Sequence, residues 1–162
     1  MDKRPIVAIV IKDPFGPEPG IICRVLADRS LYDIIRPVVV ADHWCMFEAA
    51  SRWNAEAGFK SPMEAVEHGL RALKGRCPAN CVYRGGMIDV IDMKVTKKAD
   101  EKTPELVREA ALRYKEHAEA MWLAGELDAF IFCPDSPEEL KALLDDAKDI
   151  TPLPTRDFDD EE

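Results

Sequence analysis

The sequence has no long hydrophobic run. In 162 residues no apolar stretch approaches the roughly 20 residues that a membrane-spanning helix needs. The start, MDKRPIVAIVI, leads directly into an apolar segment without the small-residue cleavage site of a secretory signal. We therefore expect a cytoplasmic protein with no membrane partner.

Clustered basic charge is also scarce. The chain has 22 Lys and Arg against 31 Asp and Glu, which gives a formal net charge of −9. The densest basic pair after the start, Lys97 and Lys98, is followed by Asp100 and Glu101. Because a field of this sign repels polyanions, nucleic acid is not an expected partner.

The cysteine pattern argues against a disulfide scaffold. The chain has five cysteines, an odd number at irregular spacings, which fits a reducing compartment. Cys23 and Cys133 lie in apolar patterns, where a thiol packs as a small hydrophobe. Cys77 and Cys81 would need two more ligands for zinc, and a redox pair would be C-x-x-C before a helix, so their role stays open.

Apolar runs alternate with helical patterns along the chain. Residues 6–11, IVAIVI, and 37–41, PVVVA, are apolar at every position, which is typical of strands covered on both faces in a parallel sheet. The helical spacing of apolar residues over 22–34 predicts a helix between them. The run LDAFIFC, 127–133, predicts a third fully buried strand.

Capping residues and helical spacing predict four further helices. Asp42, Ser61, Thr103 and Ser136 are good N-cap residues, and a proline follows the last three at the first helical position. The predicted helices cover residues 42–58, 61–75, 103–121 and 136–147. The near-alternation in MIDVIDMKV, residues 87–95, predicts one or two strands near a sheet edge, with an antiparallel pairing as an open alternative.

This alternation of strands and helices defines the fold class. We predict an α/β protein: a three-layer Rossmann-like domain with a mainly parallel sheet and helices on both faces. One domain is expected over residues 1–150, followed by an acidic, flexible tail at 151–162. The loops after the buried strands should meet at the carboxyl edge of the sheet, where open α/β sheets bind ligands.

Three polar side chains follow these strands. Asp13 comes after the first strand, and Asp42 and His43 come after the second. Two carboxylates at one edge could bind a divalent cation or a substrate hydroxyl, and His43 could touch the same ligand. A turn-forming Asp, a helix N-cap and an exposed first-turn His are the simpler interpretations, and both readings stay open.

The loop KDPFGPEPG, residues 12–20, is poorly suited to hold an anion. Such a site needs backbone N–H groups that point at the ligand and the positive end of a helix. Pro14, Pro17 and Pro19 supply no N–H, and Glu18 adds a negative charge. We therefore predict that this loop has no phosphate role, and that its glycines form turns.

Three segments resemble the 4-hydroxythreonine-4-phosphate dehydrogenase (PdxA-like) family. KDPFGPEPG is similar to the family's GDPAGIGPE, RPVVVAD to its RPLVIGD, and AGELDAFIFCPDSPEEL to its AGEVDAIVTAPINKEAL, in the same order between residues 5 and about 144. The resemblance implies a two-domain α/β chain about twice this length, which usually forms a homodimer. It also implies NAD- and metal-dependent oxidative decarboxylation of phosphorylated hydroxy amino acids or related hydroxy acids.

The resemblance is confined to the N-terminal half of that family and is incomplete there. Lys12 and Pro137 stand where the family has Gly and Lys, and the GHTE substrate motif, the metal-binding histidines and the nicotinamide region have no counterpart. We therefore predict no catalytic, cofactor-binding or metal-binding residues, and a shortened, non-catalytic ligand- or protein-binding module that self-associates.

An alternative stays open. The chain could be one subunit of a composite NAD- and metal-dependent hydroxy-acid dehydrogenase, completed by a second copy or by a partner protein that supplies the missing half. Asp13, Asp42 and His43 would then contact the metal or a small hydroxy acid.

Overall fold

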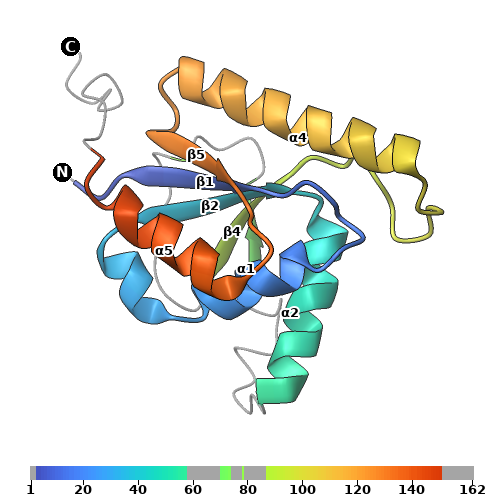
Figure 1. The fold of residues 1–162 in the computed structure, drawn as a ribbon, viewed down its shortest axis with the longest axis horizontal. Helices are drawn as coiled ribbons and strands as arrows, with labels where there is room; N and C mark the ends of the chain where they lie inside the picture. Colours follow the sequence, from blue (N-terminus) through green and yellow to red (C-terminus); the bar gives the residue numbers. More distant parts are fainter. Residues whose placement is uncertain (1–2, 58–69, 74–77, 79–86, 151–162) are drawn as a thin grey trace.

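A five-stranded, all-parallel sheet forms the centre of the protein (Figure 1). The computed structural model describes residues 3–57, 70–73, 78 and 87–150. The strand order is β3-β4-β2-β1-β5, and every neighbouring pair is parallel. The strands are β1 (Ile6–Val10), β2 (Arg36–Ala41), β3 (Leu70–Ala72), β4 (Ile88–Asp92) and β5 (Ala129–Phe132).

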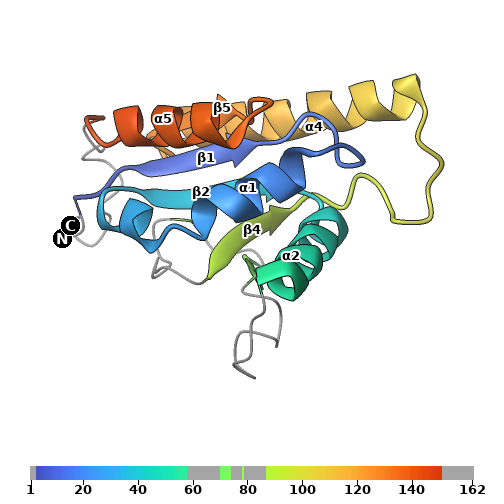
Figure 2. The same cartoon turned by 60° about the horizontal axis from the view of Figure 1, so that its bottom comes forward.

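Helices cover both faces of this sheet. Helix α4 lies on one face, and α1, α2 and α5 lie on the other (Figures 1 and 2). The predicted three-layer α/β class is therefore confirmed. The helices are α1 (Glu18–Leu26), α2 (His43–Ala57), α4 (Pro104–Leu123) and α5 (Pro137–Ala147), with a 3-10 helix η1 (Arg29–Asp33) before β2. None of the helices in the described ranges is both long and apolar enough to span a bilayer.

The core is centred on β1 and β2, as their unbroken apolar runs predict. Every residue of both strands is buried, and they pair in parallel from Ile6 opposite Arg36 to Val10 opposite Val40. Full burial of each aliphatic side chain contributes about 1.5–3 kcal/mol. Cys23 and Cys133 are buried in the same core, which confirms their predicted packing role.

Local capping signals place two helices correctly. The Thr103 hydroxyl accepts a hydrogen bond from the Leu106 N–H at 3.1 Å and caps α4. The Ser136 hydroxyl does the same for α5, accepting from the Glu139 N–H at 3.1 Å. The buried face of α4 follows the predicted stripe, through Ala110, Tyr114, Ala118 and Met121.

The position near a sheet edge predicted for residues 87–95 is confirmed, since β4 is next to the edge strand β3, but the antiparallel option is wrong. Strand β4 lies between β3 and β2 and is parallel to both. Its alternation arises from a buried charge rather than a solvent-facing side, since Asp89 is fully buried and pairs with Arg71 of β3. A period of two therefore does not show which side faces water.

Strand β5 is less buried than the sequence predicts. It was expected to be fully buried, but Ala129, Phe130 and Ile131 are half-buried and Phe132 is exposed. Among the described strands, β1 is its one neighbour. The apolar run therefore belongs to an edge strand.

Two predicted helices have different boundaries in the structure. The helix expected over 22–34 is broken: α1 ends at Leu26, and the Asp28 side chain accepts from the Ser30 N–H and starts η1. The helix expected over 61–75 is wrong at 70–72, where β3 pairs with β4. Residues 61–69, Cys77, Cys81 and the predicted tail at 151–162 lie outside the described residues.

Candidate functional site

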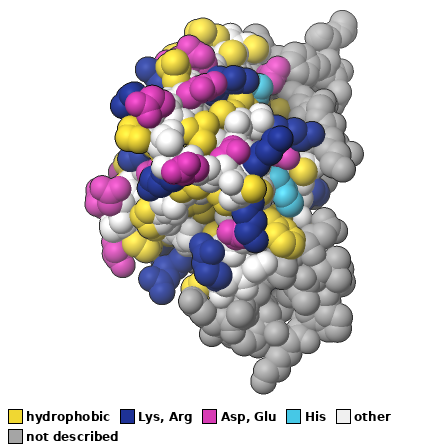
Figure 3. All heavy atoms as spheres, turned by 90° about the vertical axis from the view of Figure 1, so that its right-hand side faces the viewer, with side chains coloured by type: hydrophobic (Ala, Val, Ile, Leu, Met, Phe, Trp, Pro, Cys, Tyr) yellow, Lys and Arg dark blue, Asp and Glu magenta, His cyan; other side chains and the backbone are white. Residues whose placement is uncertain are grey.

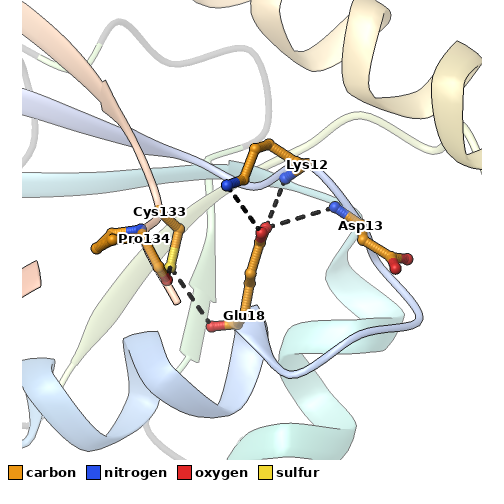
Figure 4. Close-up of polar contacts among 5 residues, drawn as sticks. All are labelled: Lys12, Asp13, Glu18, Cys133 and Pro134. Atoms are coloured by element: carbon orange, nitrogen blue, oxygen red, sulfur yellow. Dashed lines mark hydrogen bonds and ion pairs between the residues drawn. The ribbon is translucent and has the colours of Figure 1, made fainter. Parts of the chain in front are cut away.

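The loops at the carboxyl edge of the sheet form the candidate site. The loop after β1 meets the loop after β5, where the Cys133 thiol lies 3.9 Å from the Glu18 carbonyl oxygen (Figure 4). The loop after β2 meets the segment after β4 through Asp42. Figure 3 shows this side of the molecule, where acidic and basic side chains are interspersed. The described part of this edge therefore carries no broad field of one sign.

The Glu18 carboxylate fills the position that an anion would take in the loop after β1. Its Oε1 accepts hydrogen bonds from the N–H groups of Lys12 at 2.6 Å and Asp13 at 3.4 Å (Figure 4). Its Oε2 lies 3.5 Å from Lys12 Nζ. Glu18 is 5% exposed. The loop thus satisfies its own anion-binding groups.

Burial and hydrogen bonding act in opposite directions on this carboxylate. Burial raises the pKa of Glu18 above its usual range, while the Lys12 N–H, the Lys12 charge and the Asp13 N–H work against that rise. Burial is the largest effect. The closed loop therefore holds its carboxylate at an electrostatic cost.

A tight turn brings Glu18 to these N–H groups. Asp13 Oδ1 accepts from the Phe15 N–H at 2.9 Å, and the Gly16 N–H donates to the Asp13 carbonyl at 3.2 Å. A Cβ on Gly16 would lie 3.0 Å from Asp13 Oδ2, so a larger residue here would force the Asp13 side chain to shift. Asp13 thus has a turn-forming role, whatever else it does.

Asp42 is fully buried, and its carboxylate binds the loop between β4 and α4, which we call the 93–103 segment. Its carboxylate accepts from the N–H groups of Val95 at 2.9 Å and Thr96 at 2.7 Å, and from the Thr96 hydroxyl. The first N–H of α2, on His43, donates instead to Asp92 Oδ1 at 3.0 Å. Asp42 therefore connects two loops, and Asp92 provides the bond at the start of the helix.

Further contacts fix the same segment. Lys102 Nζ lies 3.0 Å from Asp13 Oδ2, and Lys98 Nζ lies 2.5 Å from Glu48 Oε2. The Trp44 indole N–H donates to the Thr96 hydroxyl at 2.9 Å. Both candidate carboxylates, Asp13 and Asp42, are thus engaged by the 93–103 segment.

Tyr114 of α4 lies beneath this arrangement. It is fully buried, and its hydroxyl forms no hydrogen bond of good geometry with the described residues. Burial and the neighbouring Asp42 carboxylate raise the pKa of Tyr114, so the phenol stays protonated. This side chain packs under Asp42 as a neutral group.

His43 has a different setting from the two carboxylates. Its ring packs against Phe47, with centroids 5.9 Å apart, and it is half-buried. It lines a surface groove of about 740 Å³ together with Trp44, Phe47, Glu48, Ser51, Arg52 and Lys98. Neither Asp13 nor Asp42 lines this groove, so the structure does not bring the three candidates to one cavity there.

A metal ion needs a cluster of ligands at this site, and a dinucleotide phosphate in the loop after β1 needs free N–H groups. Within the described ranges no three His, Cys, Asp or Glu side chains are arranged to hold a metal ion. The N–H groups of Lys12 and Asp13, which would face a phosphate after β1, are bonded to Glu18. These residues therefore support no reaction step that uses a metal ion or a dinucleotide.

Two features of the site escaped the sequence reasoning. The charge of Glu18 was recognised from the sequence. Its hydrogen bonds with the Lys12 and Asp13 N–H groups were not, because they depend on the turn and have no sequence motif. Thr96, which is 4% exposed and bonded to both Asp42 and Trp44, stands in no recognisable pattern. Only the proximity of two acidic loop residues to a lysine-rich segment could have suggested it.

The fold and the loops at the carboxyl ends of its strands define a Rossmann-like α/β domain. The Glu18 carboxylate closes the first of these loops. No protein-family model matches the sequence. The chain is nevertheless homologous to part of the 4-hydroxythreonine-4-phosphate dehydrogenase (PdxA-like) proteins, as the following relatives show.

Two curated relatives and one solved structure illustrate the relation. A 4-hydroxythreonine-4-phosphate dehydrogenase of Desulfosudis oleivorans is 30% identical over 144 residues, which cover 87% of this chain and 38% of the relative. A protein of Symbiobacterium thermophilum named as a D-threonate 4-phosphate dehydrogenase is 28% identical over 145 residues, 88% of this chain and 39% of the relative. The crystal structure of the Burkholderia phymatum 4-hydroxythreonine-4-phosphate dehydrogenase superposes with a TM-score of 0.63 at 20% identity, over 88% of this chain and 44% of that chain. The chain spans about two fifths of the length of these proteins.

Proposed function

We propose that this chain is a PdxA-like α/β module that has no dehydrogenase activity of its own, binds a ligand or a protein, and associates with a second copy. The observation that carries the proposal is the Glu18 carboxylate on the N–H groups of Lys12 and Asp13. A phosphate or carboxylate entering this loop would have to displace Glu18. The displaced side chain would lose its hydrogen bonds in a buried position, and it would repel the incoming anion.

An aromatic patch on β5 supports the association. We call Trp122, Phe130 and Phe132 the β5 edge patch. Their rings meet edge to face, with centroids 6.1 Å apart for Trp122 and Phe130 and 6.0 Å apart for Phe130 and Phe132. Trp122 is 46% exposed and Phe132 41% exposed. Exposed aromatic side chains beside a strand edge are typical of protein interfaces.

The absence of charge on this patch makes it the surface at which a second copy meets least repulsion. The chain carries a net charge of −9, so most contacts between two copies bring like charges together. The stretch from Ala129 to Pro134 contains no charged residue. Because a two-fold axis places a patch against itself, an uncharged aromatic patch is self-complementary.

Binding linkage tests the absence of dehydrogenase function. A ligand that binds only the folded state raises the melting temperature. We expect the melting temperature of the purified protein to stay unchanged in NAD together with Mg²⁺ or Mn²⁺, and with small hydroxy acids added. A rise that requires NAD and metal together would show an intact cofactor site and overturn this part of the proposal.

The alternative role is a subunit of a composite NAD- and metal-dependent hydroxy-acid dehydrogenase. It is favoured by the length of the relatives, of which this chain spans about two fifths. Purification from the native source tests it, because a stoichiometric partner carrying the remaining part of the fold would support the composite enzyme. The partly exposed candidates would then be tested as Asp13→Asn and His43→Ala, and unchanged turnover of the complex would remove them from its site.

A further inference from the structure

A second groove lies between α1, α2 and the start of α5, and we call it the arginine groove. It has a volume of about 340 Å³, within the size range of small-molecule sites. Its lining includes Gly20 and Arg24 of α1, Arg52 and Trp53 of α2, and Asp135 and Pro137 before and in α5. It is distinct from the Glu18 loop.

Two guanidinium groups line this groove without an ion-pair partner in the described part of the chain. Lys12, Lys98, Lys102 and Lys141 all have carboxylate partners, but Arg24 and Arg52 have none among these residues. The lining therefore carries two positive charges against the single carboxylate of Asp135, which leaves it net positive in an acidic protein. Guanidinium groups bind carboxylate and phosphate through paired N–H donors.

Apolar surface lies beside these charges. The Arg24 guanidinium carbon is 5.9 Å from the centroid of the Trp53 ring, a distance at which a cation and an indole attract each other. A Cβ on Gly20 would meet nothing within 4 Å, so the groove is open above α1 at this point. Trp53 thus offers a flat apolar surface next to the cations.

We propose that the arginine groove binds a small organic acid, with its acid group engaged by Arg24 and Arg52 and its apolar body against Trp53. Asp135, exposed at the same groove, accepts a hydrogen bond from a hydroxyl or amine on the ligand. A hydroxy acid with a ring or short apolar body matches all of these groups. This inference rests on the proposed function in one respect: it names the groove in which the proposed module binds its ligand.

Mandelate is a suitable probe, because it combines a carboxylate, a hydroxyl group and a phenyl ring. Titration into the full chain is followed through the indole N–H signal of Trp53 in ¹H–¹⁵N NMR spectra, assigned with Trp53→Phe. We expect a saturable shift of this signal, with the signals of Trp44 and Trp122 as internal references. The neutral ester methyl mandelate should bind at least about tenfold more weakly, because it has no charge for the arginines.

Matched variants separate the groove from general charge effects. Arg24→Gln and Arg52→Gln should each weaken mandelate binding about tenfold. Arg113→Gln, which changes an arginine paired with Glu109 on α4, should leave it unchanged. Gly20→Leu should abolish binding by filling the groove, whereas Gly20→Ala should retain it.

The outcomes decide the proposal. Equal binding of mandelate and methyl mandelate, unchanged binding in both arginine variants, or no shift of Trp53 would overturn it. A Trp53 shift with an oligoglutamate peptide but not with mandelate would also overturn it, since the groove would then be a protein contact. Phenyl phosphate binding more tightly than mandelate would identify phosphate as the preferred acid group within the same class. These readouts are independent of NAD, metal and oligomeric mass, so the inference and the proposed function can fail separately.

Discussion

A single carboxylate determines what the loop after β1 can bind. The pKa of Glu18 is raised by burial, so the folded protein holds the proton more tightly than the unfolded chain does between the ordinary pKa of about 4.5 and the folded value. In that window the unfolded state binds fewer protons. The free energy of unfolding contributed by Glu18 therefore falls as the pH rises through the window.

This effect can be measured against Glu18→Gln. We expect the stability advantage of the wild type over this variant, from urea unfolding, to shrink as the pH rises above about 4.5 and then to become constant above the folded pKa of Glu18. Titrating groups that are common to both proteins cancel in this difference, so the pH dependence that remains is that of Glu18. An advantage that grew with pH would show that the Lys12 and Asp13 contacts outweigh burial, which contradicts the balance of forces described for this loop.

The hydrogen bonds of Thr96 lead to a second prediction about stability. Thr96→Val removes the hydroxyl that bonds to Asp42 and accepts from the Trp44 indole. The buried Asp42 carboxylate and the half-buried Trp44 indole then each lose a partner. Loss of a partner costs a buried polar group about 1–3 kcal/mol, and the half-buried indole should lose less. Urea unfolding should show this loss, and Thr96→Ser should recover most of it. Equal stability of the valine and serine variants would remove the hydroxyl from the account.

Individual helices depend on local caps. Ser136→Ala and Thr103→Ala each remove one hydroxyl that accepts from a first-turn N–H. Each should lower the free energy of unfolding by about 1 kcal/mol. Ser136→Asp should retain the cap of α5, and Ser51→Ala, inside α2, serves as a control. A loss in the control as large as in the two cap variants would rule out capping as the cause.

The same elements show how far the sequence predicts the fold. Helices α4 and α5 were predicted because their caps and apolar stripes are local, and β1 and β2 because their apolar runs are unbroken. Strand β4 was predicted at the right residues, but the burial of Asp89 was missed because its ion pair with Arg71 lies on a neighbouring strand, which no local pattern encodes. Strand β5 was expected to be buried because its own residues are apolar, although burial depends on neighbours. At the site, Asp13 was recognised as a turn residue, but the partners of Asp42 lie 53 and 54 residues away.

The whole molecule is predicted to self-associate through the β5 edge patch. Native mass spectrometry and light scattering should detect a dimer at micromolar concentrations. Phe132→Asp should shift the mass toward the monomer, because a charge in an apolar two-fold contact meets its own copy.

Phe47→Asp is the matched control, since Phe47 is also 40% exposed but lies on α2. It should leave the dimer intact. A wild-type protein that remains monomeric throughout this range would contradict the self-association, and a dimer lost in Phe47→Asp but not in Phe132→Asp would place the interface elsewhere.

The most direct test of the central claim is the affinity of the loop after β1 for inorganic phosphate. It is measured through the backbone amide signals of Lys12 and Asp13, so that binding in the arginine groove is not counted. Glu18→Gly should gain saturable binding at these amides, and the wild type and Glu18→Gln should show none. Phosphate binding to these amides in the wild type, or no gain in Glu18→Gly, would contradict the account.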